Sequence, residues 1–255
     1  MIFDIANERG KGRTQAALIR RQLVLARSFR RKIRALLDHQ WQVIANHVEQ
    51  GIFDADHVID SLRGLMIKAM SEQYTRVGSV FFADVEVAFV DLKSIPSPKE
   101  HKGMAEEFWR AFHNWTLRHA ANKVKHINDA TKKIIRRVIR RETDAGGSYT
   151  EIAKAIRARA KDMNLKRALR IARTEVHAAS TYSVDEAVRS TRVPFEREWV
   201  SILDERTRPE PGSDSRWNHR EANGQRRSMN DPFDVSGEKL RFPGDPRGSA
   251  GNIIH

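Results

Sequence analysis

The chain has 255 residues, no cysteine, 40% apolar side chains and a formal net charge of +13 at pH 7. The lack of cysteine excludes disulfides, thiolate catalysis and zinc sites built on sulfur, and the apolar content suffices for the core of one large or two modest domains. No run reaches the roughly 18 apolar residues of a membrane span and no signal peptide is recognisable, so we expect a soluble protein that is made in a cytoplasm and has no membrane partner.

The positive charge is unevenly distributed along the chain. Two regions are basic: residues 1–53 have ten basic and four acidic side chains, and residues 101–170 have 18 basic and seven acidic side chains. The other two are slightly acidic: residues 54–100 have five basic and eight acidic side chains, and residues 171–255 have 13 basic and 14 acidic side chains. A positive field of this size is expected to bind a polyanion, above all nucleic acid, through phosphate contacts that do not read sequence. The alternative is the solvated surface of a basic protein, since helix faces are often charged.

The first predicted element is one long amphipathic helix from about Lys11 to Gln50, ended by Gly51. Its apolar positions recur at three- and four-residue steps and are Leu18, Leu25, Phe29, Ile33, Leu36 and Val43. Arginines crowd its first half, and those that we assign to nucleic-acid binding are Arg20, Arg27, Arg30, Arg31 and Arg34. The helix is therefore expected to carry an apolar stripe beside a basic surface.

A second helix is predicted to begin at Asp54 or Asp56 and to run to about Tyr74. Residues 77–90 fit both a helical stripe and the alternation of a strand, and we favour a helix because the neighbouring segments are helical. The Ser-Ile-Pro-Ser-Pro stretch at residues 94–98 then breaks the chain. We therefore predict an N-terminal helical region over residues 1–95.

The next predicted region, residues 96–147, is helical and strongly basic. One long helix or two extend from Lys99 to Arg141, and the aromatic cluster between Phe108 and Trp115 is typical of a core or of a surface for a partner helix. At about 100° per residue, five cations share one arc opposite an apolar face. These cations are Lys133, Arg136, Arg137, Arg140 and Arg141. The arc fits DNA phosphates, with an acidic protein surface as the alternative, and residues 142–148 end the helix as a hinge.

Residues 148–190 are predicted to form two helices that meet at Asn164, which caps the second of them. Arg173, Glu175 and His177 lie within about one turn of one another in this second helix. An ion pair that orients the helix is a more common use of such a group than catalysis. We therefore assign Arg173 and Glu175 a structural role.

Residues 194–255 are predicted to form a small module of short strands and ordered loops, because short apolar pieces alternate with turn signals. Polar side chains that could supply a general base, a phosphate clamp and a metal ligand are Asp204, Arg206, Arg208, His219 and Asp245. No nucleophile motif and no metal-site spacing accompanies them. We therefore predict no catalytic residue, no metal and no cofactor, and expect His219 to hydrogen-bond loop backbone, with Asp204 and Arg208 as ion-pair partners.

The C-terminal part also resembles a known family. The ordered motifs of residues 199–246 resemble the C-terminal module of the phage Mu F-like minor head proteins, also called phage head morphogenesis proteins, and residues 149–189 are similar to the helical part of that domain. The structural motif of the module comprises Arg173, Glu175, Trp199, Asp204, Arg208, His219, Gly224, Phe233, Pro243 and Asp245. The family usually closes on a Cys-x-Cys that the given sequence does not contain, so we do not expect a terminal cysteine pair to join His219 in a metal site.

Together these elements indicate a mainly α fold, with long amphipathic N-terminal helices followed by a small α+β C-terminal module within a domain over residues 148–255. The resemblance implies a non-enzymatic minor protein of a tailed-phage head, close to the portal vertex, that assists head assembly and DNA packaging or delivery. The implied partners are the portal protein, the major capsid or scaffold protein and double-stranded DNA, and the implied location is the virion after synthesis in the bacterial cytoplasm. Two alternatives stay open. One is a nucleic-acid-processing enzyme or injected effector that uses His219 and Asp204, and the other is a host-encoded basic scaffold protein.

Overall fold

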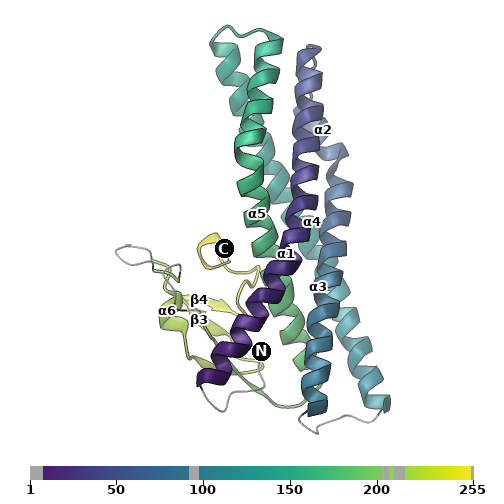
Figure 1. The fold of residues 1–255 in the computed structure, drawn as a ribbon, viewed down its shortest axis with the longest axis vertical. Helices are drawn as coiled ribbons and strands as arrows, with labels where there is room; N and C mark the ends of the chain where they lie inside the picture. Colours follow the sequence, from purple (N-terminus) through teal and green to yellow (C-terminus); the bar gives the residue numbers. More distant parts are fainter. Residues whose placement is uncertain (1–7, 92–97, 202, 204–206, 210–215, 254–255) are drawn as a thin grey trace. The chain divides into compact units, whose positions relative to one another are not determined.

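The computed structural model describes residues 8–91, 98–201, 203, 207–209 and 216–253. Long helices dominate it, namely α1 (Glu8–Glu49), α3 (Arg63–Asp91), α4 (Pro98–Asp144) and α5 (Tyr149–Ser190), with the short α2 (Ala55–Ser61) between α1 and α3 (Figure 1). The elements after α5 are β1 (Glu196–Glu198), α6 (His219–Ala222), β2 (Arg226–Ser228), β3 (Phe233–Val235), β4 (Glu238–Leu240) and α7 (Ala250–Ile253). The predicted mainly α fold with a small α+β C-terminal module is confirmed.

The chain divides into two compact units, and each long helix contributes to both. The first, here called the module unit, contains Met1–Leu25, Tyr74–Asn114 and Arg173–His255. The second, here called the helical unit, contains Ala26–Gln73 and Trp115–Ala172. The domain boundaries near residues 95 and 147 stay a prediction, and most of the proline-containing break, residues 94–97, lies outside the described residues.

Helix α1 ends as predicted. It stops at Glu49, and Gly51 follows with φ of 79°, a left-handed conformation that favours glycine. In the helical unit its most buried large apolar side chains are Phe29, Ile33, Leu37, Trp41, Ile44 and Val48. Leu36 and Val43, which were also predicted on the apolar face, are partly buried, and Val43 packs against the core of the helical unit.

The second predicted helix is divided in two. Helix α2 ends at Ser61 and α3 begins at Arg63, so Leu62 separates two helices where one helix to Tyr74 was predicted. Helix α3 instead runs on to Asp91. Residues 77–90, which could have been helix or strand, are helical as favoured from the sequence.

The core of the helical unit joins α1, α2, α4 and α5 through side chains such as Trp41, Ile59, Ile135 and Ile152. Each of these four is at most 1% exposed. Burying an apolar side chain of this size stabilises a fold by about 1.5–3 kcal/mol. The part of α4 that carries the predicted basic arc is thus anchored by a well-packed apolar core.

Buried polar groups also cross this core. Arg167 of α5 is 7% exposed and donates from Nη2 to the carbonyl oxygen of Ile127 at 2.6 Å, and its burial lowers the pKa of the guanidinium to about 10. Asn164 is 1% exposed and donates from Nδ2 to Asp38 Oδ1 of α1 at 2.9 Å. The prediction that Asn164 caps a separate helix was wrong, because α5 is continuous and the Asn164 amide finds its acceptor on another helix.

Helix α5 begins with a reciprocal capping box. The backbone N–H of Ser148 donates to Glu151 Oε2 at 2.7 Å, and the backbone N–H of Glu151 donates to Ser148 Oγ at 3.4 Å. The hydrogen bonds from the Ser148 backbone and hydroxyl lower the pKa of Glu151. Local sequence alone therefore defines where α5 starts.

In the module unit, aromatic side chains connect the helices to the C-terminal module. Phe82 stacks on Phe108 with ring centroids 4.3 Å apart, and the ring of Phe112 lies 5.8 Å from that of Tyr182. Tyr182 in turn meets Phe242 edge-on at 5.7 Å. The predicted aromatic cluster of α4 therefore contributes to a core, since Phe108 and Phe112 are at most 1% exposed.

The C-terminal module contains two antiparallel two-stranded sheets, β1 with β2 and β3 with β4. In the second sheet Phe233 pairs with Leu240. The buried core of the module consists of Trp199, Ala222, Phe233, Val235 and Leu240. Gly224 adopts φ of 80° and donates its N–H to the carbonyl oxygen of Trp199 at 2.8 Å, so this turn favours glycine over any residue with a side chain.

Candidate functional site

The predicted arc of cations lies near the end of α4, in the helical unit. All five of its members are exposed, namely Lys133, Arg136, Arg137, Arg140 and Arg141. The same helix buries Thr131, Ile135 and Val138, which are at most 6% exposed. The separation of a basic outer face from an apolar inner face, expected from the helical period, is therefore present.

Only part of the arc is neutralised by neighbouring acids. Arg136 pairs with Asp56 of α2, and Arg141 pairs with the adjacent Glu142. The remaining three members, Lys133, Arg137 and Arg140, form no ion pair with any residue that the structure describes. We call these three the free arc, because their charges are available to an external anion.

Two hollows border the arc. The larger has a volume of about 650 Å³ and is lined by Asp56, Asp129, Lys132, Lys133, Arg136, Arg137 and Arg140. The smaller has a volume of about 250 Å³ and is lined by Ile134, Arg137, Val138, Arg141 and Arg159. Arg137 lines both hollows.

The arginines predicted on α1 fall in both units. Arg20 belongs to the module unit and donates from Nε to the carbonyl oxygen of Ala16 at 3.3 Å. Those in the helical unit are Arg27, Arg30, Arg31 and Arg34, of which Arg30 is partly buried and the others are exposed. Arg34 pairs with Asp38 at 3.3 Å, whereas the other three have no ion-pair partner within the described part of the chain.

His219 lies at the start of α6, where it joins several loops. Its backbone N–H donates to the carbonyl oxygen of Arg208 at 2.8 Å, and its own carbonyl oxygen accepts from Ser201 Oγ at 2.7 Å. The ring atom Nε2 lies 3.0 Å from Asn252 Oδ1. Asp204 lies outside the described residues, so its predicted pairing with Arg208 stays a prediction.

Asp245 and Pro243 fix the turn that follows β4. Asp245 is 2% exposed, accepts the backbone N–H groups of Arg241 at 2.8 Å and Arg247 at 3.1 Å, and pairs with the Arg247 guanidinium at 2.6 Å. The carbonyl oxygen of Pro243 accepts from Thr181 Oγ1 of α5 at 2.7 Å. The carboxylate of Asp245 is thus engaged inside the protein and does not face an open site.

Arg173 and Glu175, which were assigned a structural role, have different environments on α5. Glu175 is 1% exposed and accepts from Tyr74 Oη at 2.7 Å, and burial together with this carboxylate raises the pKa of Tyr74 well above its usual value. Arg173 is exposed, without an ion-pair partner among the described residues. Residues two apart on a helix point about 160° away from each other, so these two side chains face different surroundings. The structural role assigned to both stays a prediction.

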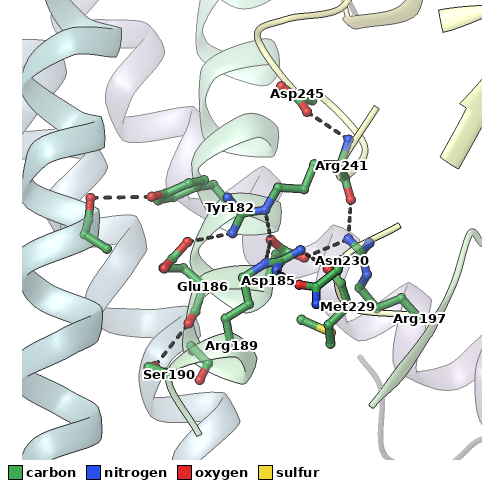
Figure 2. Close-up of polar contacts among 12 residues, drawn as sticks. Tyr182, Asp185, Glu186, Arg189, Ser190, Arg197, Met229, Asn230, Arg241 and Asp245 are labelled. Carbon is green, nitrogen blue, oxygen red and sulfur yellow. Dashed lines mark hydrogen bonds and ion pairs between the residues drawn. The ribbon is translucent and has the colours of Figure 1, made fainter. Parts of the chain in front are cut away.

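A group of ion pairs that no sequence motif reveals lies in the module unit. Asp185 of α5 is 6% exposed and pairs with Arg189 at 3.1 Å, with Arg197 of β1 at 2.9 Å, and with Arg241 (Figure 2). Glu186 also pairs with Arg241, at 2.6 Å. We call these five residues the Asp185 hub. Acidic residues beside buried alanine and valine on α5 were the only sequence signal for it.

The arginines of the hub also reach the backbone of the C-terminal module. Arg197 donates to the carbonyl oxygens of Ser228 at 3.0 Å and Asp231 at 2.6 Å, and Arg189 donates to that of Met229. Burial lowers the pKa of Arg197, against the opposing attraction of Asp185. The guanidinium groups of Arg189 and Arg197 therefore exchange water for carboxylate and carbonyl oxygens, as a buried charge requires.

The exposed basic side chains of the described residues can act as hydrogen-bond donors to a bound anion. No cluster of three or more histidine, aspartate or glutamate side chains among them could hold a metal ion. No described helix is long and apolar enough to cross a membrane. Guanidinium and ammonium groups instead offer charge-assisted hydrogen bonds, which suit phosphate or carboxylate oxygens.

Comparison with known proteins gives one match. Residues 133–244 match the family model described as Phage Mu protein F like protein, whereas no curated protein and no solved structure matches the chain. The matched part begins in the arc of α4 and continues through α5, the Asp185 hub and the strands of the module. The resemblance noted in the sequence is thereby confirmed for residues 133–244, which are similar to the phage Mu F-like head morphogenesis proteins.

Proposed function

We propose that the protein is a minor, non-enzymatic head protein of a tailed bacteriophage, made in the bacterial cytoplasm and incorporated into the virion. In this proposal it lies inside the head near the portal vertex, binds duplex DNA without sequence preference, and contacts the portal or the major capsid or scaffold protein. It assists head assembly and the packaging or delivery of DNA. The family match supports the head assignment, and the arc of α4 supports the DNA assignment.

The observation that carries DNA binding is the free arc. Lys133, Arg137 and Arg140 are exposed on a helix whose opposite face is packed into a core. This packing keeps the three charged side chains at the surface. Phosphate contacts of this kind give affinity without sequence readout, because every duplex presents the same backbone. Packed genomic DNA of any sequence is therefore a suitable ligand.

Protein contact is assigned to the C-terminal module. Its net charge is close to zero, and Arg197 and Arg241 are occupied by the Asp185 hub. Apolar side chains on both sides of β1 are nevertheless exposed, with Val193 at 41%, Val200 at 40% and Leu203 at 48%. A surface with little free charge and exposed apolar side chains suits a protein partner better than DNA.

The test is equilibrium binding of the whole protein to random-sequence duplex DNA over a salt series. Each phosphate contact contributes about 0.9 to the slope of log affinity against log salt, so Lys133→Glu, Arg137→Glu and Arg140→Glu together should flatten the slope by about 2.7. The matched control reverses three exposed cations of α5 in the same unit, Lys161, Lys166 and Arg170.

The control separates a localised site from total charge. Both triple variants lose the same six units of positive charge. An equal loss of binding in both would show that the arc is not a localised DNA-binding site. Wild-type binding with no salt dependence, or no DNA binding at all, would overturn the proposal and would favour an acidic protein surface as the partner of the arc.

A further inference from the structure

The arc lies opposite a short acidic helix. Asp56 and Asp60 are one turn apart on α2, and they meet Arg136 and Lys132, which are one turn apart on α4. The Lys132 Nζ atom lies 2.8 Å from Asp60 Oδ1. Two carboxylates in successive turns of α2 thus contact two cations in successive turns of α4.

The two ion pairs differ in how accessible their cations are. The Lys132 side chain is 18% exposed, so this ammonium group is largely enclosed. The Arg136 side chain is 64% exposed, and that of Asp56 is 43% exposed. An external phosphate could therefore reach Arg136 if Asp56 did not occupy it.

Asp56 and Arg136 both line the 650 Å³ hollow, together with all three members of the free arc. A guanidinium has five N–H donors and binds carboxylate and phosphate in the same forked geometry. The carboxylate of Asp56 therefore takes the place at Arg136 that a DNA phosphate would otherwise occupy. The carboxylate also places negative charge where a phosphate would lie.

We propose that Asp56 is an internal competitor of DNA at the arc, a residue that lowers the affinity and the salt dependence of duplex binding by holding Arg136. This inference rests on the proposed function. It adds that DNA engages the free arc first and that Arg136 becomes a phosphate ligand only when Asp56 releases it. The acidic helix α2 thus limits how tightly the head protein holds DNA.

The test compares the whole protein with Asp56→Asn in the same salt series. Asparagine keeps the size of the side chain and removes its charge, so Arg136 gains a phosphate contact and the slope should steepen by about 0.9. The loss of affinity between 50 and 200 mM salt should accordingly grow by about threefold. Far-ultraviolet circular dichroism checks that the variant keeps its helix content.

Two further variants distinguish release of Arg136 from a general change of charge. Asp129→Asn removes an acid that lines the same hollow and has no ion pair with a described residue, so it should raise affinity with an unchanged slope. In an Arg136→Gln background, Asp56→Asn should no longer steepen the slope. A slope that rises equally for Asp129→Asn, or that still rises without Arg136, would overturn the inference.

The outcomes also separate this inference from the proposed function. Wild-type binding that depends on the free arc, with an unchanged slope in Asp56→Asn, would refute the competitor and leave DNA binding intact. A wild-type protein and an Asp56→Asn variant that both fail to bind duplex DNA would refute the two proposals together. Binding that appears only in Asp56→Asn would support the competitor and contradict the proposed function of the wild-type surface.

Discussion

In the helical unit, Arg137 and Arg140 are exposed on α4 without an ion-pair partner among the described residues, whereas in the module unit Arg197 and Arg241 are largely enclosed around Asp185. The same side chain therefore serves two purposes. On α4 it leaves its donors for a ligand, and in the hub it uses them to attach β1 and the segment after β4 to α5. The net charge of the chain reflects the unpaired arginines of α4. It does not reveal the arginines of the hub, because Asp185 and Glu186 offset their charges.

The physical difference is solvation. An exposed guanidinium keeps its water, so removing it changes the fold little. A guanidinium in the hub has exchanged water for carboxylate and carbonyl oxygens, so removing one partner leaves the others buried and uncompensated. The substitutions below separate these two uses, starting with the largest expected effect.

Asp185→Ala should destabilise the module unit by about 3–5 kcal/mol, because three arginines lose a buried carboxylate. Amide hydrogen exchange over β2 to β4 would detect the loss as faster exchange in this region. The control is Asp234→Ala, which removes a half-exposed carboxylate that pairs with Lys239 at 2.8 Å and accepts the backbone N–H of Gly237 at 3.1 Å, and which should change exchange less. Equal effects would mean that the hub does not anchor the module.

Gly224→Ala should destabilise the module by about 1–2 kcal/mol, because alanine disfavours the left-handed conformation. Gly224 has φ of 80°, and no neighbouring atom lies within 4 Å of the point that an alanine Cβ would occupy, so the effect isolates the backbone. The control is Gly64→Ala in α3, where no neighbour interferes and helix propensity should add about 0.5–1 kcal/mol of stability. Denaturant titration should show a lower free energy of unfolding for Gly224→Ala and a higher one for Gly64→Ala.

Arg137→Gln with Arg140→Gln should change the free energy of unfolding by no more than about 0.5 kcal/mol, since exposed side chains without partners add little to stability. Thermal unfolding of the double variant beside the wild type checks this. A clear drop in the midpoint would show that the arc helps to hold the helical unit together, and the contrast with the Asp185 hub would then fail.

Much of the fold could be predicted because it depends on neighbours in the sequence. The spacing of apolar residues predicted α1, and the capping residues Ser148 and Glu151 mark the start of α5. The 100° step predicted the two faces of α4. Asn164 was misread because it has the residue type of a helix cap, while its actual acceptor is Asp38 on another helix.

Only part of the candidate site could be predicted from the sequence. Exposure of the arc follows from α4 alone, but the distinction between its free and paired members required α2, whose Asp56 is 80 residues away from Arg136 in the chain. Glu175 belongs to the recognised motif, yet only the packing of α3 against α5 shows that Tyr74 is its donor.

The sequence by itself determined α1, the basic face of α4 and the family similarity of residues 133–244, because helical periodicity, charge and ordered motifs are properties of the linear chain. Only the tertiary structure decided which charges are neutralised. Asp185 meets Arg197 across 12 residues and Arg241 across 56, and no periodicity relates these positions. Ion pairing depends on a few ångströms between side chains, and these distances are set by how the helices and strands pack.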